Sequence, residues 1–136
     1  KRKSGPEPPR PAAKRSAAEA LEPGVVIRNA WFGPAGTITP LHHDRYSGIL
    51  AQVAGRKYVR LYSPDETPRL YPRTGRDFNS SQVDVDAVDA DAFPLFAEAR
   101  YQECVLGPGE CLFIPRGWWH YVRSLDPSMS VSFWWT

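Results

Sequence analysis

Residues 37–64 read TITPLHHDRYSGILAQVAGRKYVRLYSP, and this stretch decides the fold. It contains three short segments rich in β-branched and aromatic residues, a composition typical of β-strands. An Ala-Gly pair at 54–55 predicts a tight turn between the second and third segments. The polar triplet HHD, at 42–44, separates the first segment from the second. Two interpretations of this triplet are open: a polar turn, or one half of a metal site.

Short segments of this strand-like composition continue through most of the chain after residue 24. Turns rich in Gly, Pro, Asp or Ser separate the segments, and the shortest of them predict a run of β-hairpins. We therefore predict an all-β domain, a sandwich or jelly roll, over residues 25–136. The eight predicted strands cover residues 24–32, 36–41, 48–53, 57–63, 101–106, 110–115, 119–125 and 128–135.

A long insertion, residues 64–100, separates the fourth predicted strand from the fifth. Loops of this length in a compact domain are usually lids or walls of a functional site, and we expect that role here. The segment FPLFAEAR, at 93–100, predicts one or two helical turns. The acidic run at 84–91 is expected to be a solvated loop, and the alternative is that it attracts a basic peptide.

Residues 1–24 differ in composition from the rest of the chain. Pro and Ala are frequent, six Lys or Arg stand against three Glu, and Leu21 is the only large apolar residue. Such a segment cannot bury enough apolar surface to offset the entropy of ordering, so we predict a disordered basic arm. The formal charge of +2 includes +3 from this arm, which leaves −1 for residues 25–136.

Two basic clusters in the arm, at 1–3 and 14–15, have roughly the spacing of a bipartite nuclear import signal. The alternative is a solvated linker. We expect a nuclear or cytoplasmic protein with no membrane partner and no direct binding to nucleic acid. Because the chain begins with Lys, we also expect it to be part of a longer product. Cys104 and Cys111 flank a short turn, where a disulfide would gain little, so we expect reduced thiols.

His42 and Asp44 lie two residues apart at the end of a predicted strand. If the strand continues through them, their side chains share one face and His43 points to the other. His120 is the only other histidine, and it follows an apolar strand and a Pro stop in GPGECLFIPRGWWHYV. Two histidines and one carboxylate form the facial triad of non-haem Fe(II) oxygenases, which leaves adjacent metal positions open for a bidentate co-substrate and O₂.

Four segments carry a resemblance to a known family: WFGPAGTITPLHHD, GRKYVRLYSP, SQVDV and PGECLFIPRGWWHYVRSLDPSMSVSFWW. From Trp31 to Thr136 the chain resembles the C-terminal part of a JmjC domain, most of all that of the small JmjC hydroxylases. The resemblance implies a double-stranded β-helix, a cupin-like jelly roll, that binds Fe(II) and 2-oxoglutarate with O₂ as co-substrate. We expect the N-terminal strands of such a domain to be lacking here.

The resemblance also assigns roles to individual residues. Lys57 would bind the distal carboxylate of 2-oxoglutarate through a charge-assisted hydrogen bond. Independently of the resemblance, Lys57 lies among apolar strand residues, where a lone cation is costly to bury without an anion. The alternative is a lysine that reaches solvent from an edge strand. The implied iron ligands are His42, Asp44 and His120, and the implied co-substrate contacts are Thr39, Lys57 and Trp134.

Other aromatic and glycine positions carry less specific predictions. We expect Trp31, Trp118 and Trp119 to belong to the core rather than to the site. Gly48 departs from the family pattern, because the resembling proteins often place at this position an Asn that contacts the co-substrate. That contact is therefore expected to be missing here.

We predict an Fe(II)- and 2-oxoglutarate-dependent oxygenase that hydroxylates a protein side chain. The resemblance favours a basic protein or peptide substrate, with arginyl hydroxylation preferred over demethylation of N-methyl-lysine. One alternative is a non-catalytic JmjC remnant that acts as an interaction module. Another is a different metal-dependent cupin, although its first motif would normally contain His-x-His and a following Glu, which this sequence lacks.

Overall fold

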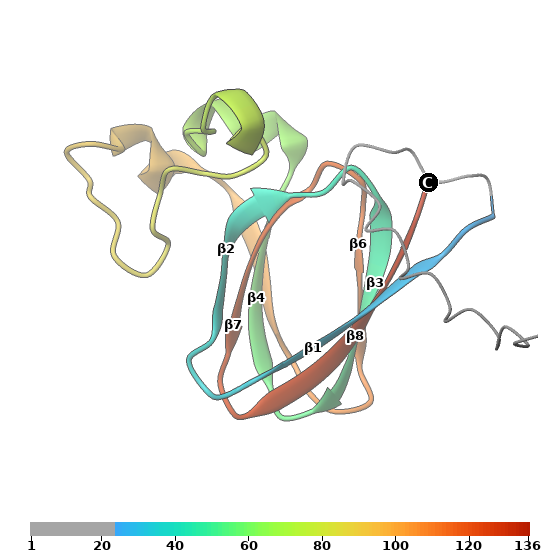
Figure 1. Ribbon diagram of the computed structural model, residues 1–136. Helices are drawn as coiled ribbons and strands as arrows, with labels where there is room; N and C mark the ends of the chain where they lie inside the picture. The colour runs from blue at the N-terminus through green and yellow to red at the C-terminus, as the bar shows by residue number, and fades with distance from the viewer. Residues whose placement is uncertain (1–23) are drawn as a thin grey trace, which may run out of the picture.

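The computed structural model describes residues 24–136, which form eight strands and three short 3-10 helices (Figure 1). Every predicted strand is present close to its expected bounds, so the all-β prediction is confirmed. The predicted arm and its two basic clusters lie outside the described residues, apart from Gly24. In the described part, no helix is long and apolar enough to span a membrane. The elements are β1 (Ile27–Gly33), β2 (Ile38–His43), β3 (Ser47–Ala54), β4 (Lys57–Tyr62), η1 (Pro64–Arg69), η2 (Gly75–Asp77), η3 (Pro94–Glu98), β5 (Tyr101–Leu106), β6 (Cys111–Ile114), β7 (Trp119–Ser124) and β8 (Ser128–Trp135).

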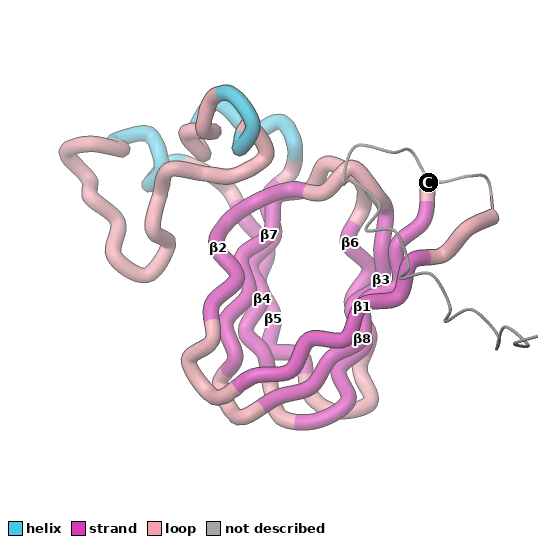
Figure 2. Tube along the Cα trace, in the orientation of Figure 1, coloured by secondary structure: helices cyan, strands magenta, loops and turns pink. Residues whose placement is uncertain are grey.

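The strands form two antiparallel sheets that face each other (Figure 2). Sheet A has the order β1-β8-β3-β6, and sheet B has the order β2-β7-β4-β5. The pairing is nested, because β1 pairs with β8, β2 with β7, β3 with β6 and β4 with β5. The chain is in effect one long hairpin folded over on itself, which is the predicted jelly-roll arrangement.

The prediction of local hairpins was wrong. The short turns between β3 and β4, β5 and β6, and β7 and β8 each carry the chain from one sheet to the other. Gly55, in the first of these turns, has a φ of 66°. A Cβ atom at this position would lie 2.3 Å from the carbonyl oxygen of Pro127, in the turn before β8. Two crossing turns therefore pack against each other, and glycine meets both the steric and the conformational demand.

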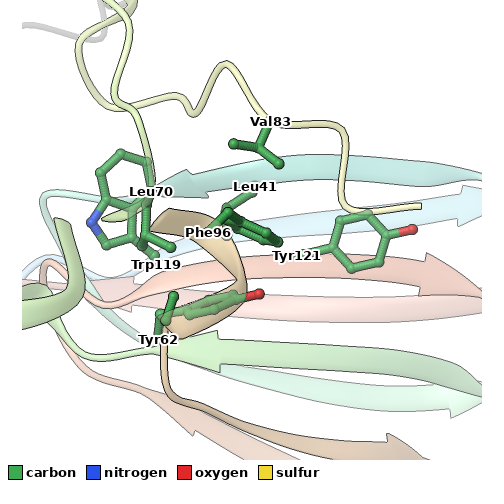
Figure 3. Close-up of a cluster of buried hydrophobic side chains, with 8 residues drawn as sticks. Leu41, Tyr62, Leu70, Val83, Phe96, Trp119 and Tyr121 are labelled. Carbon is green, nitrogen blue, oxygen red and sulfur yellow. The ribbon is translucent and has the colours of Figure 1, made fainter. Parts of the chain in front are cut away.

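The largest buried side chains lie outside the sandwich, on the outer face of sheet B (Figure 3). Trp119 and Tyr121 of β7 are each only 1% exposed. The insertion between β4 and β5 covers this face and contributes Leu70 and Phe96 to the cluster. The predicted helical turn, η3, is present and helps to build this outer core. Ser80 of the insertion also forms a β-bridge with His42 of β2, and the expected role of the insertion as a lid or wall stays a prediction.

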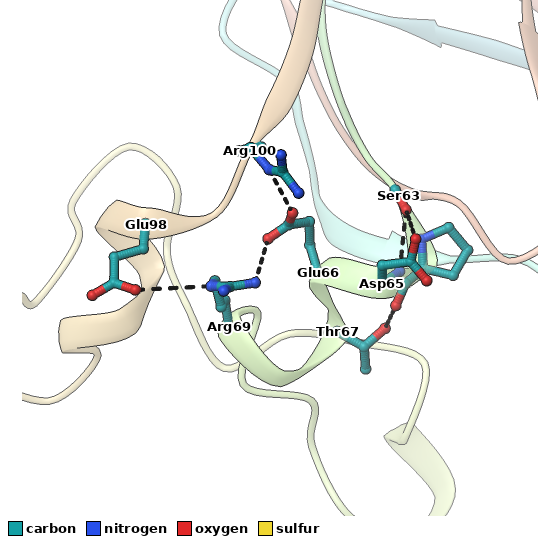
Figure 4. A network of polar contacts seen from close by, with 8 residues as sticks. Ser63, Asp65, Glu66, Thr67, Arg69, Glu98 and Arg100 are labelled. Atoms are coloured by element: carbon teal, nitrogen blue, oxygen red, sulfur yellow. Dashed lines mark hydrogen bonds and ion pairs between the residues drawn. The ribbon is translucent and has the colours of Figure 1, made fainter.

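A buried carboxylate organises the insertion (Figure 4). Glu66 of η1 is 3% exposed, and its oxygens lie 3.0 Å from Arg69 Nη1 and 3.4 Å from Arg100 Nε. Desolvation opposes its ionisation, but hydrogen bonds and charge from the two arginines outweigh this effect, and the pKa of Glu66 lies below its usual value. Ser63 caps η1 by accepting a hydrogen bond from the backbone N–H of Asp65.

The acidic run at 84–91 is more than a solvated loop. Asp86 accepts hydrogen bonds from the Tyr121 hydroxyl and, at 3.1 Å, from Arg123 Nη1. Burial and this carboxylate raise the pKa of Tyr121. Asp89 accepts hydrogen bonds from two backbone N–H groups that follow it in the chain. These carboxylates therefore fasten the insertion to β7 and stabilise its turns.

The space between the sheets contains far less apolar packing. Its apolar cluster is small and centres on Val59 of β4 and Val122 of β7. Buried polar side chains occupy part of the remainder, and Ser130 of β8 donates a hydrogen bond of 2.7 Å to Gln52 of β3. The rest of the inner space is a cavity, and the predicted site residues line it.

Candidate metal centre and its cavity

The structure brings together the three predicted metal ligands. His42 is the second-last residue of β2, Asp44 follows the end of the strand, and His120 lies directly opposite His42 on β7. The Nε2 atom of His42 is 3.9 Å from one Asp44 oxygen, and the Nε2 atom of His120 is 3.7 Å from the other. One ligand atom from each residue lies within 4.8 Å of the others, so a single cation can contact all three. Among the described residues, this is the only such group of potential ligands.

Backbone carbonyls orient both imidazoles. The Nδ1 atom of His42 is 2.8 Å from the carbonyl oxygen of Pro40, and that of His120 is 3.1 Å from the carbonyl oxygen of Trp118. With each Nδ1–H donating to its carbonyl, each Nε2 presents its lone pair toward Asp44. This is the tautomer that a metal-binding histidine requires.

The charge state of the triad also suits a cation. Burial, and after it the charge of His42, lowers the pKa of His120 to about 3, so His120 is neutral at physiological pH. Burial raises the pKa of Asp44, although the two adjacent histidines oppose the shift. A carboxylate that is costly to ionise beside the neutral His120 is stabilised when a cation binds between them.

A bulge in β2 explains how the strand serves the site and the outer core together. Thr39 pairs with Val122 and His42 pairs with His120, so β2 has one extra residue between these points. The bulge lets Thr39 and His42, three residues apart, both line the cavity, while Leu41 is buried in the outer core. His43 points away from the triad, as predicted, with its ring centroid 4.6 Å from that of Trp119.

The cavity beside the triad has a volume of about 160 Å³. All three residues expected to contact a co-substrate, Thr39, Lys57 and Trp134, line it. Lys57 is 8% exposed, and no carboxylate of the described chain forms an ion pair with it. Burial lowers its pKa, and an anion in the cavity would offset the cost of its charge.

Comparison with known proteins identifies the family of this chain. Residues 8–136 match the family described as the cupin-like domain. This chain belongs to the cupin-like domain family. It is 57% identical over 119 residues to lysine-specific demethylase 8 of Xenopus tropicalis, an alignment that covers 87% of this chain and 27% of the relative.

Two further relatives extend the similarity. Lysine-specific demethylase JMJ30 of Arabidopsis thaliana is 57% identical over 109 residues, which cover 79% of this chain and 25% of the relative. Jumonji C domain-containing protein 5 of Drosophila melanogaster is 45% identical over 114 residues, which cover 83% of this chain and 28% of the relative. The resemblance to JmjC domains is thus confirmed. The chain spans about a quarter of the length of these curated relatives.

Aromatic side chains form the sheet A wall of the cavity in this cupin-like domain. Trp134 stacks on Tyr46 with ring centroids 6.1 Å apart, and Trp31 lies 6.3 Å from Trp134 on the other side. The Trp31 indole donates a hydrogen bond of 2.9 Å to Ser132. Trp31 is 42% exposed and lines the cavity, so its assignment to the core was wrong, whereas that of Trp119 was right. Trp118 is partly buried against the inner apolar cluster.

Sequence reasoning missed Trp31 and Tyr46 as cavity residues. The available signal was strand alternation, because Trp31 shares a face of β1 with Ile27 and Asn29. These two residues are more buried than Arg28 and Ala30, and Trp31 lines the cavity. That signal was weak, since the face of a strand that meets a cavity can be identified only once its partner strand is known.

Proposed function

We propose that this chain carries the active site of an Fe(II)- and 2-oxoglutarate-dependent oxygenase that hydroxylates a protein side chain. One observation carries the proposal: the three metal ligands and an unpaired buried lysine line the same cavity. The three ligands would bind a cation, and Lys57 would bind the carboxylate of an acid beside it. The similarity of the chain to JmjC relatives also supports a site that holds a metal ion and an acid together.

The donor set fits ferrous iron. Two neutral imidazoles and one carboxylate suit a borderline divalent transition metal better than Mg²⁺ or Ca²⁺, which prefer oxygen ligands. We assign His42, Asp44 and His120 as the ligands. The carboxylate of Asp44 offsets part of the metal charge, and the backbone carbonyls behind both histidines keep the lone pairs directed at the metal.

The cavity fits 2-oxoglutarate. Lys57 provides the cation for the distal carboxylate, Thr39 provides a hydroxyl, and Trp134 provides an apolar wall that excludes water. When bound, iron and 2-oxoglutarate supply the oxidising chemistry, in which O₂ and the co-substrate give succinate, CO₂ and one oxygen atom inserted into a substrate C–H bond. The chain itself binds, orients and shields these groups, so no additional acid or base is required.

The proposed substrate class is supported by the names of relatives. Two of the relatives are named lysine-specific demethylases. Hydroxylation of an N-methyl carbon releases that carbon as formaldehyde, whereas hydroxylation of an arginine side chain leaves a stable alcohol. Both outcomes start from the same C–H insertion. We propose a lysine- or arginine-containing protein segment as the substrate, and the mass change of a modified peptide distinguishes the two.

The decisive experiment is an anaerobic titration of the purified protein with Fe(II) and 2-oxoglutarate. The expected result is a visible metal-to-ligand charge-transfer band that is lost in His42→Ala and weakened in Lys57→Ala. His43→Gln is the matched control, because this neighbouring histidine faces away from the triad. Its band should match that of the wild-type protein.

The competing functions predict different results. An interaction module that retains the fold but not the site would give no band while its circular dichroism and thermal unfolding stay those of a folded protein. A cupin that does not use 2-oxoglutarate would bind Fe(II) but show no dependence on the co-substrate or on Lys57. Either result would remove the oxygenase proposal.

A further inference from the structure

Gly48 occupies an unusual position in the cavity wall. It lies on β3 directly opposite Trp134 of β8 and faces the cavity. A Cβ atom at this position would lie 2.6 Å from Trp134 Cδ1 and 3.0 Å from the carbonyl oxygen of Phe133. Its φ lies outside the left-handed region, so the backbone would accept another residue. With the Trp134 indole in this position, only glycine fits at residue 48.

The contact determines where the Trp134 side chain lies. β8 runs between β1 and β3, so the indole leans away from Trp31 and across β3. Tyr46, two residues before Gly48, stacks on the same indole at an interplanar angle of 26°. Among residues 24–136, no acceptor is hydrogen bonded to the Trp134 indole N–H, in contrast to that of Trp31.

We propose that Gly48 is a specificity-determining residue of this cavity. By leaving space for the indole against β3, it keeps open the volume between Trp134, Lys57 and the metal ligands, and this volume sets the size of acid that can bind. Gly48 contributes no contact of its own, so its role is to position Trp134. The inference rests on the proposed function, because it identifies the occupant of the cavity as a short-chain 2-oxo acid.

A side chain at this position would have a defined effect. It would push the indole off β3 toward Trp31 and into the cavity, where Lys57 stands on the opposite sheet. Packed interiors respond to an added methyl group by displacing neighbours rather than by compressing. The cavity would narrow although neither the metal ligands nor Lys57 had changed.

The test compares Gly48→Ala with Gly107→Ala. A Cβ atom at Gly107 would meet only a flexible carboxylate oxygen of Glu110, at 3.4 Å, so this variant controls for the loss of a glycine. In the anaerobic Fe(II) titration, Gly48→Ala should weaken the affinity for 2-oxoglutarate by about fivefold or more, given the cost of overpacking. Gly107→Ala should leave it unchanged.

A second measurement uses the wild-type protein and does not depend on the folding of a variant. The ¹⁵N-labelled indole resonance of Trp134, assigned by its loss in Trp134→Phe, should shift when 2-oxoglutarate binds. The indole of Trp119, which donates to Thr67 on the outer face of sheet B, should stay in place as an internal reference. In folded Gly48→Ala the Trp134 resonance should be displaced before any ligand is added.

The outcomes separate this inference from the function on which it rests. A charge-transfer band in the wild-type protein, with an unmoved Trp134 resonance and equal affinity in Gly48→Ala, overturns the role of Gly48 alone. The absence of any band in the wild-type protein overturns the proposed function and this inference together. A band accompanied by the resonance shift and the weaker variant supports both.

Discussion

The two faces of sheet B differ in the residues that they carry and in how these residues are packed. The inner face carries His42, His120 and Lys57, and it borders the cavity beside an apolar cluster that is much smaller than the outer one. The outer face carries Leu41 and Trp119 under the 64–100 insertion, where the largest side chains are fully buried. In a typical sandwich the core lies between the sheets. Here much of the apolar packing has moved outside, and the interior is available for chemistry.

Strand alternation makes this division possible. In β7, Trp119 and Tyr121 face outward while His120 faces inward, and in β2, Leu41 and His42 divide in the same way. Each of the two histidines therefore has a neighbour in the chain that is buried in the outer cluster. The site is held by packing on the far side of its own strands, so polar residues inside need not stabilise the fold.

The largest expected effect tests this division directly. Trp119→Ala should lower the free energy of unfolding by about 3–5 kcal/mol, because it opens a cavity in the outer core. Trp31→Ala removes the same side chain from the cavity side, where Trp31 is 42% exposed, and should cost clearly less. Urea denaturation of both variants provides the measurement. Equal losses would mean that the two faces contribute alike to stability.

The second prediction concerns an inner-face residue that should matter for ligand affinity and not for stability. Lys57→Met should reduce the affinity for 2-oxoglutarate on the order of 10- to 100-fold, which corresponds to the loss of a hydrogen bond to a charged group. The free energy of unfolding should stay level or rise, because an unpaired buried cation is replaced by an apolar side chain of similar length. Isothermal titration and urea denaturation on the same preparation test both parts. A large loss of stability would show that Lys57 has a structural role.

The same lysine predicts a pH dependence. Burial lowers the pKa of Lys57 from its ordinary value of 10.5, so the free protein loses this cation at a lower pH than a solvated lysine would. Anion binding requires the protonated form, and affinity should therefore fall as the pH rises through this lowered pKa. The titratable groups that share the cavity are His42, Asp44, Tyr46 and His120.

Lys57→Arg separates the lysine from those other groups, because a guanidinium stays charged throughout the alkaline range. Ligand-observed NMR of 2-oxoglutarate binding between pH 7 and about 10 should show a decline in the wild-type protein and a flatter profile in the variant. Parallel declines in both proteins would assign the effect to another group.

The sequence was sufficient to predict the strands and the triad, for different physical reasons. Strand positions follow from local composition, and all eight were found. The three candidate ligands could be singled out because His42, Asp44 and His120 lie within recognisable local motifs, and the structure brings these residues together. The pairing of strands could not, because every short turn that suggests a hairpin here crosses between sheets, and the true partners are far apart in the chain.

The roles of the insertion and of Trp31 also depend on non-local contacts. Nothing near residues 64–100 in the sequence indicates that they cover the outer face of sheet B. Loop length alone favours a lid, and only the alternation of large apolar residues on β7 against the inward His120 hints at an external core. Trp31 likewise has the composition of a core residue, and its place beside a cavity depends on the position of β8.

The smallest expected effect concerns the charges that hold the insertion. The pKa of Glu66 is lowered in the folded protein, so its ion pairs stabilise the fold above the ordinary value of 4.5 and this contribution is lost as the pH falls through the lowered pKa. Glu66→Gln should therefore be less stable than the wild type at neutral pH, and the difference should narrow on acidification. Glu98→Gln, whose carboxylate is 67% exposed and 3.9 Å from Arg69, should show neither effect. Thermal unfolding as a function of pH measures both variants. The charge-transfer band should stay unchanged in each, because neither Glu66 nor Glu98 lines the cavity.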